Sequence, residues 1–144
     1  METEIILKKL KHIEEMLKEL EHIFSSSFKE FANNKYAIGT AERYFQLVVD
    51  TASDINTQIL IEKIRKTPDT YKQSFSYLAR AKIITGGLAK NLVEGAKIRN
   101  ILVHDYDFEE DYKLFYHSAK KLLPSFQEYL KAIIKYLGEE GNKI

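Results

Sequence analysis

Apolar residues recur every three or four positions along most of the chain, and this spacing constrains the fold more than any other feature. Such a period places apolar side chains on one face of an α-helix. In the first segment the apolar positions are Ile6, Leu10, Ile13, Leu17, Leu20, Phe24, Phe28 and Phe31. No segment shows the alternation of apolar and polar residues that is typical of a strand. The sequence therefore predicts an all-α protein, with its first helix loosened at residues 25–27.

Turn and capping residues divide the chain into about five predicted helices. Residues 33–35 connect the first helix to the second, and Pro68 disfavours a helical conformation in the residue before it. Thr70 and Gln73 have the spacing of a capping box, and Gly138 is expected to end the last helix. The predicted helices span about residues 5–31, 40–65, 70–82, 88–104 and 107–138. Helices joined by short connections predict an antiparallel up-and-down bundle.

Length and composition fit one domain over residues 1–144. The chain is 44% hydrophobic and 30% charged, and it has no cysteine, which excludes disulfides and thiolate metal sites. The first four residues are acidic rather than basic, which argues against a secretory signal. No apolar run approaches the ~20 residues that cross a bilayer. We therefore expect a cytoplasmic protein without a membrane span.

The net charge of +1 limits how this chain can contact nucleic acid. Proteins that bind nucleic acid in general carry a basic excess, which is absent here. Any contact with RNA must therefore depend on a small local patch rather than on the field of the whole protein.

Residues 99–106, with the sequence RNILVHDY, place three chemically capable side chains in an apolar stretch. Arg99 carries the guanidinium group that is best shaped to hold a phosphate with two parallel N–H donors. His104 can both accept and donate a proton near neutrality. Together they suffice to cut a ribose-phosphate backbone without a metal or cofactor. The alternative is that Arg99 forms a buried ion pair and His104 caps a helix.

The spacing of these residues on a helix limits how they can cooperate. At 100° per residue, Arg99 and His104 point ~140° apart on one straight helix. Asn100 and His104, four positions apart, share a face. Either the helix ends near His104 and turns its ring inward, or two copies of the chain pool their side chains. This helix is apolar on nearly every side, so a two-fold interface would bury it and create a shared site.

The motif Arg-x4-His-x-Tyr, formed by Arg99, His104 and Tyr106, resembles that of HEPN-domain proteins of the HepT type. The resemblance covers roughly residues 38–137. Its supporting segments are residues 41–46 with Asp54 downstream, residues 70–75 with Leu78, and residues 86–91 leading into Val93. Residues 97 and 98 precede the arginine where many relatives carry glycine and an apolar or aromatic residue.

The resemblance implies a small helical homodimer that acts as a metal-independent endoribonuclease toxin. It also implies a partner, a nucleotidyltransferase antitoxin of the MntA type, which silences the toxin by transferring AMP onto the tyrosine that corresponds to Tyr106. On this hypothesis His104 is the general acid or base, Arg99 binds the scissile phosphate, and Asn100 orients the imidazole or binds RNA. The products would be a 2′,3′-cyclic phosphate and a 5′-hydroxyl. The alternative function is a non-catalytic dimeric module that binds a nucleotidyltransferase or a nucleotide.

Other candidate sites have simpler interpretations. The acids within residues 105–111 fit the start of a helix better than a metal site, and no metal is expected. His12, His22 and His117 are expected on helix surfaces. Residues 86–87 lack the lysine and the strand of a phosphate-binding loop, so we interpret this glycine pair as a hinge between helices.

Overall fold

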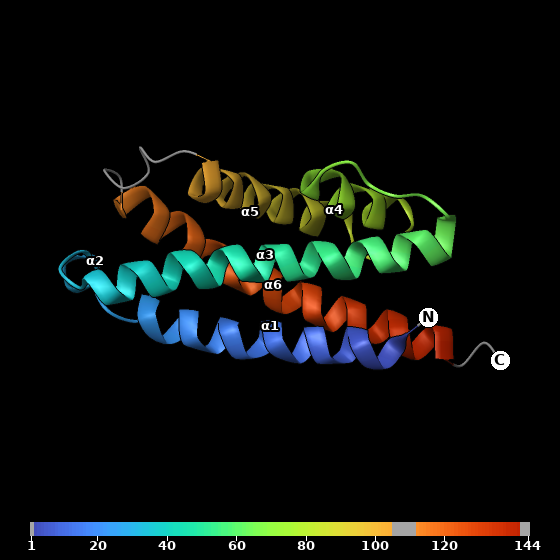
Figure 1. Ribbon diagram of the computed structural model, residues 1–144, viewed down its shortest axis with the longest axis horizontal. Coiled ribbons are helices and arrows are strands. Elements are labelled where there is room, and N and C mark those ends of the chain that lie inside the picture. The colour runs from blue at the N-terminus through green and yellow to red at the C-terminus, as the bar shows by residue number, and fades with distance from the viewer. Residues whose placement is uncertain (1, 105–111, 142–144) are drawn as a thin grey trace.

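The long helices run up and down along one axis in the computed structural model, which describes residues 2–104 and 112–141 (Figure 1). The helices of these residues are α1 (Thr3–Phe24), α2 (Phe28–Ala32), α3 (Lys35–Ile64), α4 (Tyr71–Arg80), α5 (Gly86–His104) and α6 (Tyr112–Gly141). Helix α1 packs on α3 and α6, α5 packs on α6 and α3, and the short α4 lies against both α3 and α5. The predicted all-α, up-and-down bundle is confirmed.

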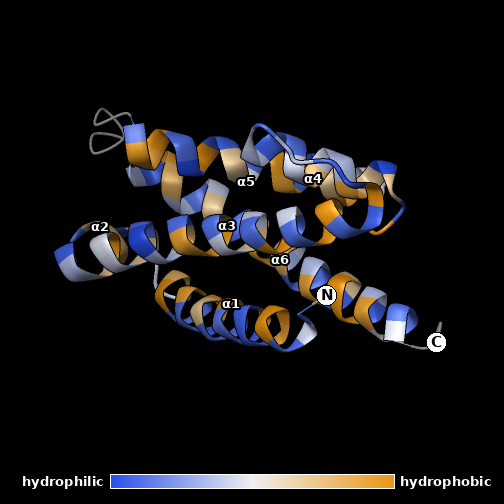
Figure 2. Cartoon of the chain, turned by 45° about the vertical axis from the view of Figure 1, so that its right-hand side comes forward, coloured by the Kyte–Doolittle hydropathy of each residue, from blue (hydrophilic) through white to orange (hydrophobic). Residues whose placement is uncertain are grey.

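The core forms where the apolar faces of the helices meet. Hydrophobic residues recur at intervals along the helices, with hydrophilic residues between them, as expected when one face of a helix is buried (Figure 2). Six phenylalanines of this core are at most 1% exposed: Phe24, Phe31, Phe45, Phe75, Phe115 and Phe126. Phe45 meets both Phe115 and Phe126 edge to face, with ring centroids 6.1 and 5.9 Å apart. These contacts join α3 to α6.

The first predicted helix is divided in two, so the described residues contain six helices where about five are expected. The break falls at the serines where loosening is predicted. Ser25 donates its hydroxyl to the carbonyl of His22, and Ser27 accepts from the backbone N–H of Glu30. Serine competes for backbone hydrogen bonds in this way and so favours helix ends. Tyr116 on α6 also donates to the carbonyl of Ser26, which holds the break against the bundle.

Side-chain caps set the ends of the middle helices. Asn34 accepts from the N–H of Ala37 at 3.1 Å, so α3 starts five residues before the predicted Thr40. Thr70 accepts from Gln73 N–H at 3.1 Å, as the capping box predicts. The amide oxygen of Gln73 accepts from the N–H of Asp69 instead of that of Thr70, so the reciprocal bond lies one residue further out.

Helix α6 runs past Gly138 to Gly141, so the expectation that Gly138 ends it is wrong. Glycine ends a helix when it takes a left-handed conformation, and no glycine of the described residues has a positive φ. Pro124 lies inside α6. None of the described helices is long and apolar enough to span a membrane.

Candidate active site

Helix α5 carries the predicted site residues, and its start is set by Thr85. The Thr85 hydroxyl accepts from the backbone N–H of Leu88 at 3.1 Å, and its carbonyl accepts from Ala89 at 3.0 Å. The helix begins at Gly86, two residues before the predicted start. Gly86 and Gly87 therefore form the first turn of α5, and the expectation that they form a hinge is wrong.

Gly95 lets α5 approach α6 closely, one turn before Arg99. A Cβ atom at Gly95 would lie 2.9 Å from Cζ of Phe126 and 3.2 Å from its Cε2. Carbon atoms in contact normally lie about 3.5–4.0 Å apart, so only glycine fits here without movement. This close packing holds α5 against α6 one turn before Arg99.

Arg99 reaches α3 and α4 from this position. Its Nε donates to Oδ1 of Asp50 at 2.7 Å, the length of a strong charge-assisted hydrogen bond. The arginine side chain is 16% exposed and the Asp50 side chain 26%, so solvent still reaches both groups. The ion pair that the sequence admits for Arg99 is therefore present.

The other two nitrogens of the guanidinium are held more loosely. Nη1 lies 3.3 Å from Oδ1 of Asn100, and Nη2 lies 3.4 Å from the hydroxyl of Tyr71. Both distances exceed the usual 2.7–3.2 Å range for N–H···O bonds. Among the described residues, Arg99 therefore has one strong partner at Nε and weak partners along its Nη edge.

Tyr71, the first residue of α4, lies under the guanidinium group. The Cζ atom of Arg99 is 4.5 Å from the centre of the Tyr71 ring, within the range of a cation–π contact. Burial raises the pKa of Tyr71, the negative charge of Asp50 raises it further, and the charge of Arg99 opposes this. The phenol therefore stays neutral around pH 7 and keeps its O–H donor.

His104 is the last residue of α5, and its side chain is exposed. Five residues along a helix correspond to a rise of ~7.5 Å and a rotation of ~140°, so Arg99 and His104 leave the helix in different directions. Asn100 is drawn to Arg99, since its Oδ1 accepts from Nη1. Tyr106 and the acids of residues 105–111 lie outside the described residues.

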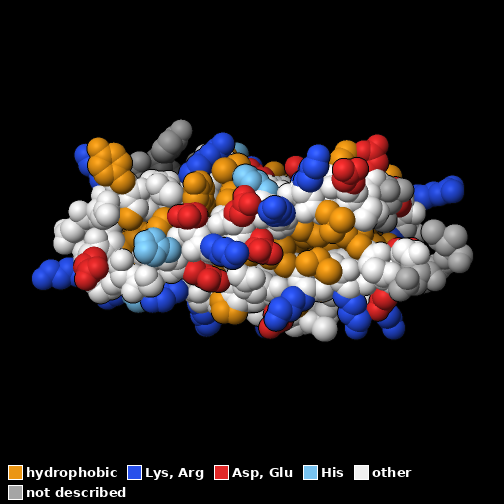
Figure 3. All heavy atoms as spheres, turned by 90° about the horizontal axis from the view of Figure 1, so that it is seen from below, with side chains coloured by type: hydrophobic (Ala, Val, Ile, Leu, Met, Phe, Trp, Pro, Cys, Tyr) orange, Lys and Arg blue, Asp and Glu red, His pale blue; other side chains and the backbone are white. Residues whose placement is uncertain are grey.

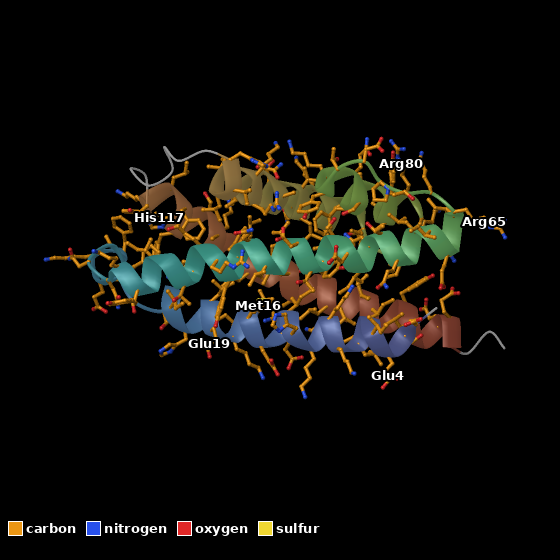
Figure 4. All side chains as sticks on the ribbon, viewed as in Figure 1. Glu4, Met16, Glu19, Arg65, Arg80 and His117 are labelled. Atoms are coloured by element: carbon orange, nitrogen blue, oxygen red, sulfur yellow. The ribbon has the colours of Figure 1, made fainter. Side chains whose placement is uncertain are left out.

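The remaining histidines lie on the surface, as predicted. His12 and His22 are exposed on α1. His117 lies on α6 near α2, where its ring stacks on Phe28 with centroids 6.1 Å apart (Figure 4). Among the residues described, no three His, Cys, Asp or Glu side chains are grouped to hold a metal ion. The face seen in Figure 3 intersperses Lys and Arg with Asp and Glu.

Sequence reasoning missed Asp50 and Tyr71. Asp50 lies 49 positions from Arg99 in the chain, and Tyr71 lies 28 positions from it. Local spacing carries no information about a pairing over such distances. One feature of the sequence does point to Tyr71. Residues 70–75, which contain it, resemble the third helix of the family, but this resemblance assigns no role to the tyrosine.

Comparisons with known proteins identify the family and support the fold. A family model described as "Ribonuclease HepT-like" matches residues 13–133. The mRNA nuclease HepT of Shewanella oneidensis is 29% identical over 134 residues, which cover 91% of this chain and 97% of that protein. The tRNA nuclease HepT of Aphanizomenon flos-aquae is 28% identical over 137 residues, covering 95% and 92%.

A solved structure shares the fold. It is the tri-AMPylated Shewanella oneidensis HEPN toxin in complex with the MNT antitoxin. The TM-score is 0.81 at 24% identity, and the match covers 91% of this chain and 97% of the toxin.

Proposed function

Because the chain belongs to the family of HepT-like ribonucleases, we propose that it is an endoribonuclease toxin whose site is built on Arg99 and His104. The observation that carries the proposal is the state of Arg99. Its Nε is held by Asp50 at 2.7 Å, while the contacts of its Nη edge within residues 2–104 and 112–141 are long. A guanidinium held in this way keeps two parallel donors for a phosphate.

The reaction we propose is an internal transfer followed by release of the 5′ fragment. An imidazole takes the proton of the ribose 2′-hydroxyl, and the 2′-oxygen attacks the adjacent phosphorus. The bond to the 5′-oxygen breaks, and that oxygen receives a proton from an imidazolium. The products are a 2′,3′-cyclic phosphate and a 5′-hydroxyl. Proton transfer by His104 contributes ~10²–10⁴-fold, and Arg99 stabilises the charge on the phosphate without a metal.

The active form we propose is a homodimer in which α5 meets α5. Within the described chain α5 packs on α3, α4 and α6, and its apolar residues Val93, Ile101, Leu102 and Val103 are only half-buried, although the first three also touch the core. Partly exposed apolar side chains on a helix favour contact with a second apolar surface. A two-fold axis there would bring Arg99 of one subunit and His104 of the other to one cleft, which the ~140° between them prevents on a single helix.

The partner we propose is a nucleotidyltransferase antitoxin, which is the class of partner that the solved toxin complex contains. It would transfer AMP onto Tyr106, two residues beyond His104. The added phosphate would repel RNA from Arg99 by placing negative charge at the mouth of the cleft. We place both proteins in the cytoplasm, where their RNA substrate is found.

A second candidate function, a non-catalytic module that binds a nucleotidyltransferase or a nucleotide, is favoured by two observations. Asp50 already neutralises Arg99, and the net charge of the chain is only +1. A protein that binds its partner through the α5 surface needs neither free positive charge nor a proton-transfer group.

Cleavage of RNA in the presence of EDTA separates the two functions. The toxin predicts cleavage by the wild-type protein that is lost in both Arg99→Ala and His104→Ala, with cyclic phosphate at the new 3′ ends. His117→Ala is the matched control, because His117 is also exposed but lies on α6, where its ring stacks on Phe28 of α2. Cleavage that is equal in all four proteins, or absent from the wild type, contradicts the toxin proposal.

A further inference from the structure

The Asp50 carboxylate lies where an RNA-cutting site should not tolerate a negative charge. It is 2.7 Å from Nε of Arg99, the group that we assign to the scissile phosphate. A carboxylate this close repels a phosphate and offsets part of the attraction of the arginine. We therefore ask whether Asp50 improves the orientation of the Arg99 guanidinium.

The orientation of the guanidinium depends on which of its nitrogens donates to Asp50. A guanidinium has five N–H donors in one plane, and Asp50 occupies the Nε side. The Cζ atom lies over the ring of Tyr71, 4.5 Å from its centre. A short hydrogen bond at Nε and a ring contact at Cζ together restrict how the group can turn. The Nη edge is then the part of Arg99 that remains for a ligand.

The two contacts on that edge are suited to exchange. Nη1 to Asn100 is 3.3 Å and Nη2 to Tyr71 is 3.4 Å, both longer than the Nε bond by more than half an ångström. A phosphate with two oxygens could replace both weak contacts at once while the short bond to Asp50 persists. Asn100 and Tyr71 would then regain the same contacts after product leaves.

We propose that Asp50, supported by the Tyr71 ring, is a positioning residue that aims the Nη edge of Arg99 at the scissile phosphate. This inference rests on the proposed ribonuclease function and adds to it a residue on α3 that touches no RNA. Asp50 lowers the net charge of the site and raises the precision with which Arg99 stabilises the transition state. Loss of Asp50 should therefore lower kcat without raising KM.

The experiment compares three substitutions on α3 by their effects on kcat and KM. Asp50→Ala removes the hydrogen bond and the charge, and we expect kcat to fall about 10- to 100-fold, the cost of a catalytic group displaced by about 1 Å. Asp50→Asn keeps an acceptor oxygen without the charge, and it should restore kcat to within about 5-fold of wild type. Glu62→Gln is the matched control, because Glu62 is exposed on α3 about three turns beyond Asp50, and it should leave both constants unchanged.

A second measurement does not depend on catalysis. The Nε–H proton of Arg99, identified by its loss in Arg99→Lys, should give a resolved and slowly exchanging NMR signal in the wild type and in Asp50→Asn. The signal should disappear in Asp50→Ala. Circular dichroism of each variant reports whether the fold is kept, and the NMR signal is compared only among folded proteins.

The outcomes distinguish failure of this inference from failure of the proposed function. A wild-type protein that cuts no RNA refutes the ribonuclease, and the inference about Asp50 with it, whatever the NMR signal shows. An active wild type with unchanged kcat in Asp50→Ala overturns the positioning role alone and leaves Asp50 as a structural ion-pair partner. A fall in kcat that Asp50→Asn does not restore also overturns it, since charge rather than orientation would then be responsible.

Discussion

The close contact between Gly95 and Phe126 predicts that Gly95→Ala lowers the stability of the protein, by an amount that the packing distances allow us to estimate. In Gly95→Ala the new methyl group would lie 2.9 Å from Cζ of Phe126, so the ring or α5 must move by roughly 0.6 Å or more to reach an ordinary contact distance. Phe126 is fully buried and packs edge to face on Phe45, which leaves its ring little room. Overpacking of this kind costs about 1–3 kcal/mol.

Alanine also has a higher helix propensity than glycine, which offsets part of that cost. The gain in a helix interior is about 1 kcal/mol, so Gly95→Ala should change the free energy of unfolding by about 0 to −2 kcal/mol. Gly39→Ala on α3 is the control, because nothing lies within 4 Å of its added Cβ and only the propensity gain remains. The difference between the two variants isolates the overpacking term of about 1–3 kcal/mol.

Urea unfolding of both variants, followed by circular dichroism at one protein concentration, measures this difference. Equal concentrations are needed because association of subunits shifts apparent stability. If Gly95→Ala proves as stable as Gly39→Ala, α5 is not held tightly against Phe126. The reasoning that this contact positions Arg99 would then fail.

Two further predictions concern stability. Tyr129 is fully buried and donates to Oδ1 of Asn56 at 2.6 Å, and burial raises its pKa well above the ordinary value of 10. The stability that neutral Tyr129 contributes is complete below about pH 10 and falls as the pH rises from there toward the folded pKa, because only the unfolded chain ionises in that range. Tyr129→Phe should lower the free energy of unfolding by about 1–3 kcal/mol at pH 7 and reduce its decrease above about pH 10. Chemical denaturation at several pH values measures both effects. A decrease in the variant as steep as in the wild type would contradict the assignment. Arg65→Gly should stabilise by up to about 1 kcal/mol, because Arg65 ends α3 in the left-handed region with φ 53° and ψ 40°. A lower melting temperature in this variant would show that its side chain makes a compensating contact.

The helices were predictable from sequence because their information is local. Apolar spacing determined the face of each helix, and the Thr70 cap was found from two residues three positions apart. The helix ends were less predictable. Arg65 and Lys82 take the positive φ angles that glycine favours, whereas Gly138 continues a helix. Backbone conformation at these positions follows from packing, which local sequence does not specify.

The candidate site was predictable only in part for the same reason. The motif identified Arg99 and His104 from side-chain chemistry, and the family resemblance added Tyr106. Asp50 lies on another helix, and only the packing of α3 against α5 brings it to Arg99. A charged partner that is distant in the chain requires the fold before it can be recognised.

Mixing two inactive variants tests the shared cleft most directly. Arg99→Ala and His104→Ala proteins are combined under conditions that exchange subunits, exchange is verified by native mass spectrometry, and RNA cleavage is measured. The account predicts recovered cleavage, since each mixed dimer retains one intact arginine and one intact histidine at the same cleft. If the mixed dimers form and remain as inactive as either parent, the two side chains do not meet across an interface.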